Sequence, residues 1–426
     1  MPQLKILISG AGIAGLASAL WLSKLGHDIT IIERFPTLRA TGLQVDLRGH
    51  GIEVLKRMGL EQAFRAKSVP EQGLQVVDSR GRRWAYFPAN RSGKGLQSFT
   101  TDWEIMRGDL CRLLHDACED RVKYVFGTYI ENFQEDSDEF VEVLFSDGRR
   151  DRFDLVIGAD GQGSRTRKMM LGSNTPDRIT WLGGMYFGYF TIPKPLQEGE
   201  DFRATSYMAP GRRFILTRRH RPDRVQVYLG CKTDSESLKN ARRGDVQEEV
   251  NAFVEIFRGA GWQTEQFLKA LQEDTDDFYC ERIGVVKMDS WSQGRVVLVG
   301  DAGYCPSANT GMGTTSALVG AYILAGEISK IQKGHETKDH NTKKELLMAL
   351  KSYDEKFRPF MDQVQRGLTE DWDVWDWIAS TWLNVLIFNF LVAVASFLRI
   401  NILGRFALRE DVKDWSLPDY EEMTKG

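Results

Sequence analysis

The N-terminal run LKILISGAGIAG (residues 4–15) constrains the fold more than any other stretch. Its β-branched, apolar start predicts a buried parallel strand, and Gly10, Gly12 and Gly15 follow at GxGxxG spacing before an apolar helix. A second apolar strand then ends at Glu33. Such glycines permit a tight turn, a close ligand approach and close packing of helix on strand, while the acidic residue can accept both hydroxyls of a ribose. The alternative is a tight turn without a ligand, but strand, helix and carboxylate together predict a dinucleotide-binding βαβ unit.

The composition narrows the class of protein. The chain has 426 residues, a net charge of −3 and no long run of one charge sign, so we expect no nucleic-acid partner. Its five cysteines are odd in number and show no CxxC spacing, and its six histidines are scattered, which disfavours disulfides and a metal site. The N-terminus lacks the apolar core of a signal peptide, and we therefore expect a cytoplasmic protein.

The order of the apolar runs predicts an α/β fold. Strands and turns alternate through the middle of the chain, a late apolar strand follows, and the C-terminal part has helical periodicity. We predict a Rossmann-type nucleotide-binding domain with a β-rich substrate domain layered over it and a C-terminal helical segment. The predicted boundaries are 1–70, 106–175 and 281–335 for the nucleotide-binding domain, 71–105 and 176–280 for the substrate domain, and 336–426 for the C-terminal helices.

Two more apolar strands end in an Asp–Gly or Gly–Asp corner. Asp160–Gly161 follows FDLVIGA, and its alternative interpretation is a reverse turn with a capped helix. Asp301 follows VVLVG, at the kind of strand end where open α/β sheets bind ligands, so its carboxylate can hold a sugar-like hydroxyl. Gly311 and Gly313 then let the backbone approach a flat ring at a helix N-terminus. Arg107 opens another apolar helical stretch, and taken alone it would be a surface arginine.

The most basic stretch is GRRFILTRRHRPDR, residues Gly211–Arg224. Charge clusters are usually solvated surface, so we predict a hairpin with basic edges here rather than a dedicated anion site.

The stretch Trp377–Leu398 carries no charge and is long enough to span a bilayer. Several Ser, Thr and Asn residues interrupt it, and three aspartates precede it closely. We therefore favour a buried or lid-like helix packed on the body of the protein. The alternatives are a membrane-surface or spanning helix and an oligomer interface.

Taken in this order, the motifs resemble those of the class A FAD-dependent monooxygenase family, the para-hydroxybenzoate hydroxylase-like flavoproteins. The resemblance covers Leu4–Ala325 and is closest to the flavin monooxygenases that hydroxylate tetracycline. It implies an oxidoreductase with FAD, NAD(P)H and O2 that hydroxylates or epoxidises an aromatic, phenolic or polyketide-like molecule through a C4a-hydroperoxyflavin, as in secondary metabolism. Only one GxGxxG is present, so the nicotinamide cofactor is expected to dock transiently.

The resemblance also implies roles for single residues. Glu33 falls on the adenosine ribose, Arg107 at the ribityl–phosphate region and Asp301 on the ribityl chain. TGLQVDLRG matches a strand whose buried aspartate contacts the flavin, which makes that residue Asp46, and the preceding Arg39 favours NADPH. Asp160–Gly161 is the family's DG motif, tied to both cofactors. The predicted cofactor residues are Gly10, Gly12, Ala14, Gly15, Glu33, Arg34, Arg39, Asp46, Arg107, Asp160, Gly161, Asp301, Gly311, Gly313, Thr314 and Thr315.

The chain departs from the family pattern after Asp301, since Tyr304 replaces its histidine, Ser307 and Ala308 its proline pair, and Thr315 its asparagine. The departures raise the question of whether the space over the flavin is reshaped. The candidate substrate contacts on the middle strands are Tyr189, Tyr207 and Arg212, although such residues are more often ordinary members of a sheet.

Two other functions stay open at this point. One is a flavin-dependent reductase or dehydrogenase without oxygen insertion, and the other is a non-enzymatic nucleotide-binding protein on the same fold.

Overall fold

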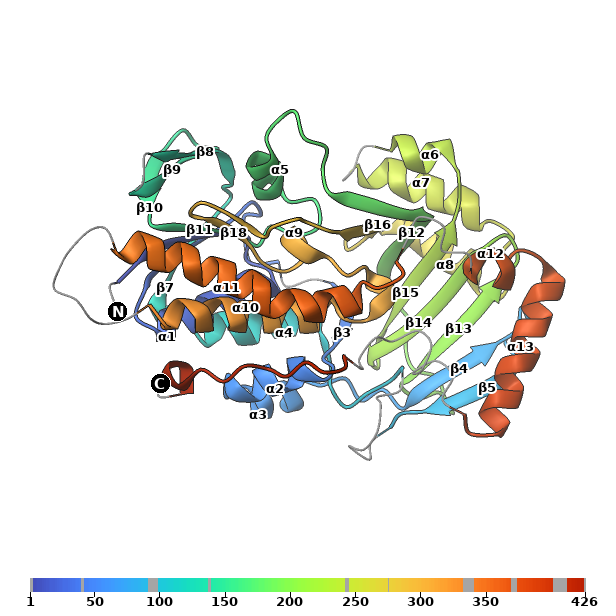
Figure 1. The fold of residues 1–426 in the computed structure, drawn as a ribbon. Coiled ribbons are helices and arrows are strands. Elements are labelled where there is room, and N and C mark those ends of the chain that lie inside the picture. The colour runs from blue at the N-terminus through green and yellow to red at the C-terminus, as the bar shows by residue number, and fades with distance from the viewer. Residues whose placement is uncertain are drawn as a thin grey trace.

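Two large β-sheets lie side by side in the computed structural model, each with helices packed on it (Figure 1). The structure describes residues 3–39, 42–90, 99–136, 139–241, 245–274, 276–331, 341–368, 374–400 and 412–424. Mixed parallel and antiparallel sheets with helices make this an α/β fold, as predicted. The exact division into six segments stays a prediction.

The first sheet is the six-stranded nucleotide-binding sheet, in the order β17-β18-β11-β1-β2-β7. Its neighbours pair in parallel except at β17–β18. Because β1 lies between β11 and β2, chain segments far apart in sequence meet on either side of it. The strands are β1 (Lys5–Ser9), β2 (Asp28–Glu33), β7 (Val122–Phe126), β11 (Leu155–Gly158), β17 (Ser292–Gln293) and β18 (Val296–Leu298).

Helices α1 (Ile13–Lys24) and α10 (Gly313–Ser329) pack together and are buried along almost their whole length. Their sequences are apolar all round, which is typical of helices enclosed by other elements. Helix α11 (Asn341–Val364) packs on the outer side of α10, and α4 (Arg107–Asp116) packs on α1 (Figure 1). A small antiparallel sheet is formed by β8 (Ile130–Asp136), β9 (Phe140–Phe145) and β10 (Arg150–Phe153).

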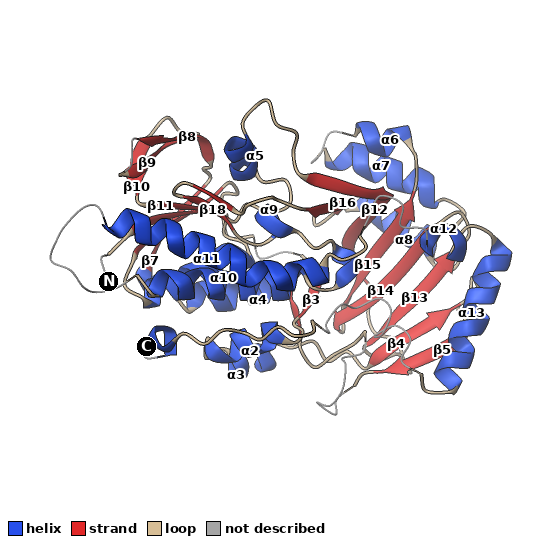
Figure 2. Ribbon diagram, viewed as in Figure 1, coloured by secondary structure: helices blue, strands red, loops and turns tan. Residues whose placement is uncertain are grey.

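The second sheet has seven strands in the order β16-β12-β15-β14-β13-β4-β5, and it is antiparallel except where β13 pairs with β4 (Figure 2). One of its faces is covered by α7 (Val246–Phe257) and α8 (Thr264–Glu273). We call the opposite face, which carries Leu74 and Tyr189, the inner face. The strands are β4 (Gly73–Val77), β5 (Arg83–Pro88), β12 (Ile179–Pro193), β13 (Arg203–Ala209), β14 (Arg213–Arg221), β15 (Arg224–Lys232) and β16 (Tyr279–Val286).

A two-stranded ribbon connects the two halves. It consists of β3 (Gln44–Asp46) and β6 (Glu104–Met106), which pair antiparallel. The remaining described elements are α2 (His50–Arg57), α3 (Glu61–Ala66), η1 (Glu119–Arg121), α5 (Arg165–Leu171), α6 (Glu236–Asn240), α9 (Asp301–Tyr304), η2 (Ala308–Thr310), α12 (Val374–Ile378), α13 (Trp382–Phe397) and α15 (Glu421–Thr424).

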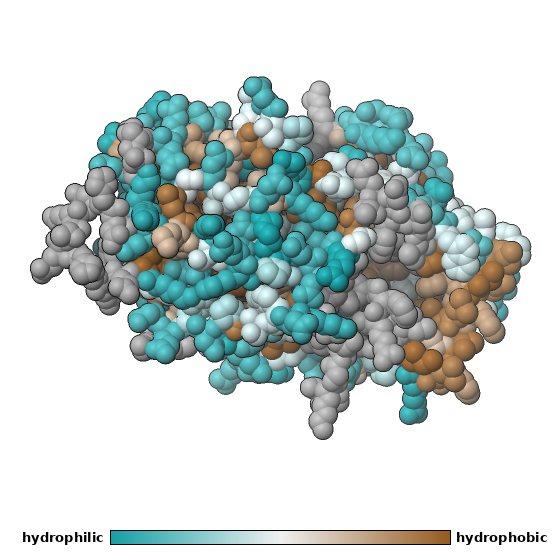
Figure 3. Space-filling model, viewed as in Figure 1, coloured by the Kyte–Doolittle hydropathy of each residue, from teal (hydrophilic) through white to brown (hydrophobic). Residues whose placement is uncertain are grey.

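The uncharged stretch Trp377–Leu398 forms parts of two helices rather than one. Helix α12 ends at Ile378, and α13 begins after Thr381, whose hydroxyl accepts a hydrogen bond from the Asn384 amide. None of the described helices is both long and apolar enough to cross a bilayer. Helix α13 packs its inner residues against β5 and leaves an apolar face exposed, which forms the brown region at one end of Figure 3.

The buried imidazole of His27 joins the first strand to the turn before the second. Its Nδ1 accepts a hydrogen bond from the Leu4 amide at 3.2 Å. Burial lowers the pKa of His27 to about 4. The folded protein therefore holds this ring neutral at pH values where the unfolded chain takes up a proton.

We expect the free energy of unfolding to fall as the pH drops from about 6.5 to about 4, because only the unfolded state gains the proton on His27 over that range. His27→Asn keeps an acceptor for Leu4 and cannot be protonated, so it should lose part of this pH dependence. Urea unfolding of both proteins across this pH range measures the effect. Identical pH profiles would contradict the assignment.

Candidate active site

The site lies where the parallel strands of the nucleotide-binding sheet reach their carboxyl ends. Ser9 pairs with Ile32 on one side and with Gly158 on the other, and Gly158 pairs in turn with Leu298. The residues that follow these strand ends include Gly10, Glu33, Asp160 and Asp301, and they consequently share one edge of the sheet. The strand order reverses direction around β1, which is where such sheets bind ligands.

The glycine turn after β1 has the geometry that its spacing predicts. Gly10 has φ 109°, and a Cβ there would lie 2.5 Å from the Ala159 carbonyl oxygen. A Cβ on Gly15 would lie 2.0 Å from the Gly10 carbonyl oxygen. On Gly12, by contrast, the nearest atom would be the Arg107 Nη2 at 3.8 Å. Gly10 and Gly15 thus serve the packing of the protein itself, while the Gly12 side is open towards a guanidinium and fits a phosphate group.

Glu33 and three arginines surround this turn. The Glu33 carboxylate accepts hydrogen bonds from the Ala11 amide at 2.9 Å and the Phe35 amide at 3.1 Å, which fixes it beside the glycine loop. Arg39 lies over the rings of Phe35 and Tyr279, at 5.4 and 5.1 Å from their centroids. Burial lowers the pKa of Arg39, and the neighbouring charges of Arg107 and Arg34 lower it further.

Asp301 is exposed although Gly300 and Ala302 on either side are buried. The positive charge of Arg107 acts on Asp301, so the two side chains lie within electrostatic reach. An acidic oxygen held at a strand end in this way suits a hydroxyl-bearing chain.

The N-terminus of α10 faces the same edge. Gly311 is in the left-handed conformation at φ 65°, and no side chain caps the helix at Met312. A Cβ on Gly313 would meet no atom within 4 Å, so there is room beside the first turn. Uncapped amides and free space at a helix start fit the negatively polarised edge of a ring.

Asp160 caps a helix in this structure. Its carboxylate accepts hydrogen bonds from the Arg165 amide at 2.9 Å, the Thr166 amide at 3.0 Å and the Ser164 and Thr166 hydroxyls. The capped helix that the sequence left as an alternative is therefore present. Gly161, at φ 81°, makes the turn that directs the carboxylate to α5.

Arg167 is a buried residue that the motifs did not identify. Its guanidinium pairs with Asp177 at 2.7 Å and donates to the carbonyls of Ala302 at 2.8 Å and Gln162 at 2.7 Å. It thereby joins the loop after β11 to the loop after β18. Nothing in the sequence separates this arginine from its exposed neighbour Arg165.

The Asp46 carboxylate pairs with the buried guanidinium of Arg48 at 2.5 Å. The Thr315 hydroxyl accepts from the Arg48 amide at 3.0 Å and donates to the Arg48 carbonyl at 3.1 Å. Thr315, one of the departures from the family pattern, therefore ties the end of β3 to the start of α10.

Tyr304, another of these departures, lies in the core. Its ring packs against Trp291 and Phe357 at 4.8 and 5.2 Å, and its hydroxyl lies 3.2 Å from the Tyr353 hydroxyl. The residue therefore attaches α11 to the strand behind Asp301 instead of shaping the ligand side.

Of the three candidate substrate contacts, the structure brings only Tyr189 to the inner face, where it packs edge-on against Tyr228. The prediction for the other two is wrong. The Tyr207 hydroxyl donates to the Ala260 carbonyl at 2.8 Å on the face covered by α7 and α8. Arg212 lies in the turn before β14 and pairs with Asp376 at 3.0 Å. Strand alternation decides the side of each residue, and the register could not be read from the sequence.

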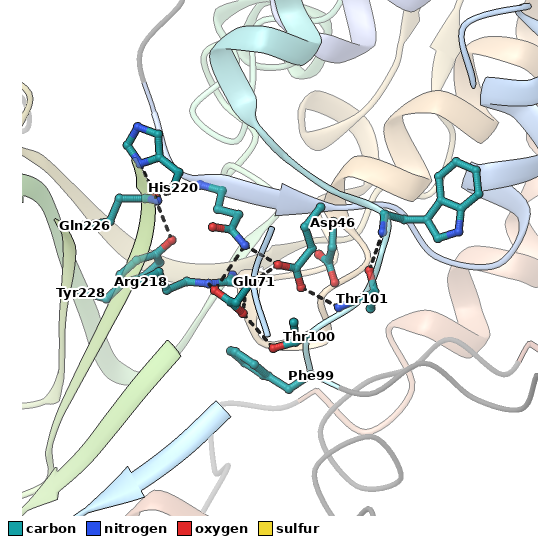
Figure 4. Close-up of polar contacts among 12 residues, drawn as sticks. Asp46, Glu71, Phe99, Thr100, Thr101, Arg218, His220, Gln226 and Tyr228 are labelled. Carbon is teal, nitrogen blue, oxygen red and sulfur yellow. Dashed lines mark hydrogen bonds and ion pairs between the residues drawn. The ribbon is translucent and has the colours of Figure 1, made fainter. Parts of the chain in front are cut away.

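The basic stretch also differs from its prediction, because Arg218 within it is only 8% exposed. Arg218 contacts Glu71 at 2.7 Å and Glu104 at 2.6 Å, and the Thr100 hydroxyl donates to Glu71 at 2.7 Å (Figure 4). Burial raises the pKa of Glu104 to about 8, against the opposing effect of Arg218. This cluster joins the β3–β6 ribbon to the inner face.

Comparison with known proteins agrees with this geometry. Residues 3–367 match the family model described as an FAD binding domain. The chain is 51% identical to an FAD-dependent monooxygenase, asL4, of Sarocladium schorii over the full length of both, and 42% identical to the flavin-dependent monooxygenase eupH of a Phoma species over 90% of this chain and 88% of that protein. The crystal structure of the tetracycline destructase Tet(51) superposes with a TM-score of 0.74 at 30% identity, covering 99% of this chain and 100% of that one.

The chain belongs to the FAD-binding family of class A flavin-dependent monooxygenases, and it is an FAD-dependent oxidoreductase. The residues fit FAD, since the glycine loop, Glu33, Asp301 and the start of α10 offer groups suited to a pyrophosphate, a ribose, a ribityl chain and a ring along one edge.

The two glycines of the turn give a matched test. Gly12→Ala should fold normally, because its Cβ has room, and should weaken FAD binding by roughly tenfold or more, or about 1.4 kcal/mol. Gly15→Ala should instead destabilise the fold by about 1–3 kcal/mol, since its Cβ collides with the Gly10 carbonyl. Flavin fluorescence titration and thermal unfolding separate the two effects. A Gly12→Ala protein with unchanged FAD affinity would contradict the open phosphate side.

Proposed function

We propose that this enzyme uses NAD(P)H and O2 to insert one oxygen atom into an aromatic, phenolic or polyketide-like molecule held between the cofactor edge and the inner face. The observation that carries the proposal is the meeting of two surfaces. Polar and backbone groups gather at the sheet edge, and an apolar, aromatic face lies opposite, with Leu74, Tyr189 and Tyr228. A flat, largely apolar substrate is complementary to such a face.

Bound FAD supplies hydride acceptance and oxygen activation, and the protein's own groups bind and orient. In the proposal, Glu33 holds the adenosine ribose, Arg107 neutralises phosphate charge, and Asp301 binds the ribityl chain. The uncapped start of α10 stabilises negative charge on the ring. We also keep four further residues as proposed cofactor contacts. They lie on the segments that follow β1, β2 and β11 and at the start of α10, and they are Ala14, Arg34, Asp160 and Thr314.

We propose NADPH as the reductant. Arg39 and Arg34 lie at the end of β2, where a 2′-phosphate would find two cations. A hollow beside Arg107 adds further positive charge, and its lining residues are Gly42, Lys67, Val69, Met106, Gly108, Asp109, Arg112, His220 and Arg221.

The relatives support the substrate class. The structural neighbour Tet(51) is a tetracycline destructase, and this chain is 30% identical to it over almost its whole length. Tetracyclines are polycyclic and polyketide-like, so a related inner face here suits molecules of that general shape.

The proposal is tested by measuring NADPH oxidation against a panel of phenols and polyketides and by mass spectrometry of the products. We expect substrate-dependent NADPH consumption and a product heavier by one oxygen atom, which carries the label when ¹⁸O2 is used. NADPH consumption with an unlabelled, oxidised product would favour the dehydrogenase alternative. No NADPH consumption with any compound would favour the non-enzymatic alternative.

We propose further that the exposed face of α13 contacts a lipid surface. Trp382 and Phe397 are 70% and 86% exposed, and the residues between them add Leu386, Phe390 and Leu391. Side chains this exposed are poorly placed to line a pocket, and a contiguous apolar face of this kind marks an interaction surface. Arg399, which follows the helix, is exposed and adds a cation suited to phospholipid headgroups.

Changing Leu386 and Phe390 together to serine should reduce flotation with phosphatidylserine-containing liposomes several-fold and leave NADPH oxidation unchanged. Light scattering of the parent and the variant measures their oligomeric state and serves as the control. A parent protein that does not float but forms a dimer, lost in the variant, would replace the membrane proposal by an oligomer interface. If the variant changed neither flotation nor oligomeric state but raised the KM for the organic substrate, α13 would instead be a lid over the active site.

A further inference from the structure

We propose that Glu104 is held in its protonated form between Gln44 and Arg218, and that this neutral acid positions Asp46, the carboxylate that we place against FAD. Glu104 is thus a positioning residue rather than a catalytic one. The inference rests on FAD binding by this family and on the proposed place of Asp46, and its first test needs no cofactor.

The ribbon brings two carboxylates face to face. Asp46 and Glu104 are direct cross-strand partners in the antiparallel pair of β3 and β6, so their side chains emerge on the same face. Like charges directly opposite each other destabilise such a pair. The charge of Asp46 is also balanced separately, because Arg48 pairs with it at 2.5 Å.

Among the described ion pairs of the neighbouring cluster, one cation, Arg218, faces two carboxylates. The Arg218 guanidinium contacts both Oε1 and Oε2 of Glu71, at 2.7 and 2.8 Å, and reaches one oxygen of Glu104 at 2.6 Å. Glu71 and Glu104 are 2% and 0% exposed. An excess negative charge at such depth is costly. A proton on Glu104, which has fewer contacts with Arg218 than Glu71 has, removes this excess charge.

The Gln44 side chain lies beside the proposed proton. As oriented, its Nε2 points to Glu104 and Glu71, and within the described residues its buried Oε1 accepts no hydrogen bond. The two ends of an amide are assigned from the surrounding hydrogen bonds. With the amide rotated by 180°, Gln44 Oε1 would accept the acid proton of Glu104, and Nε2 would take the position that Oε1 has now.

The charged and titratable groups around Glu104 act on its pKa in both directions. Burial raises the pKa of Glu104 to about 8, with Glu71 and Asp46 adding to the shift and Arg218 opposing it. Burial raises the pKa of Tyr228, which faces the cluster from β15 and stays neutral. His220 is reached through Gln226, and burial lowers its pKa, so it adds no charge at neutral pH (Figure 4). The Thr101 amide donates to Glu104 Oε1 at 3.0 Å, which either state accepts.

The consequence is a cofactor site that depends on one proton. Above the pKa of Glu104, its negative charge faces Asp46 across the ribbon, and we expect Asp46 to move from its place. FAD affinity should therefore be constant at neutral pH and weaken as the pH rises through about 8.

The first test is infrared difference spectroscopy of the apoprotein between pH 7 and pH 9. The carbonyl band of a protonated carboxylic acid should be lost as the pH rises, and it should be absent from Glu104→Gln. Absence of such a band from the parent at pH 7 would overturn the assignment of the proton. This result does not depend on any activity of the enzyme.

The second test is FAD affinity by fluorescence titration over the same pH range. The dissociation constant of the parent should rise about tenfold from pH 7 to pH 9, and that of Glu104→Gln, which fixes a neutral side chain, should change little. Glu71→Gln is the matched control. It leaves Arg218 a single carboxylate, so Glu104 should ionise below pH 7 and the transition should move to lower pH.

A merely structural cluster would instead lower stability in all variants without moving the pH transition. Thermal unfolding at pH 7 shows which variants are folded. Equal pH dependence in the parent and in a folded Glu104→Gln would overturn the positioning role, even if the enzyme proves to be an oxygenase.

Discussion

The close approach of α1 to the Gly10 carbonyl is the contact on which the cofactor edge depends. Because Gly15 has no Cβ, the helix starts directly above the turn, and its first amides face the strand ends. The neighbouring strand β11 lies equally close, with the Ala159 carbonyl in the space that a Gly10 side chain would need. Glu33, Asp160 and Asp301 reach one edge only because these backbones are packed so tightly.

The features that were predicted well from the sequence are those that residues close together in the chain determine. The glycine turn, the acidic end of β2 and the glycines before α10 are each specified by residues close together in the chain, and the structure has them in the expected forms. The family comparisons bear out the fold class and the FAD-dependent monooxygenase.

The side of the sheet on which a residue lies, and its tertiary partners, were not predictable. Tyr207 and Tyr189 are both sheet tyrosines, and only the register places them on opposite faces. Arg218 looked like one more surface cation because Glu71 and Glu104, which bury it, lie more than a hundred residues away. Tyr304 looked like a change in the pocket, whereas its hydroxyl meets a tyrosine of α11. Contacts between side chains so far apart in the sequence produce no pattern that can be recognised locally in the chain.

The strand order has a consequence for how the protein is made. The first strand of the nucleotide-binding sheet has β2 on one side at once and β11 later on the other, but β18 and α10 begin only at Val296 and Gly313. Tyr353 of α11, later still, donates to the Leu298 carbonyl at the end of β18. A nascent chain therefore carries the glycine turn long before it has Asp301 and the start of α10, and we expect flavin loading to wait for synthesis of most of the polypeptide.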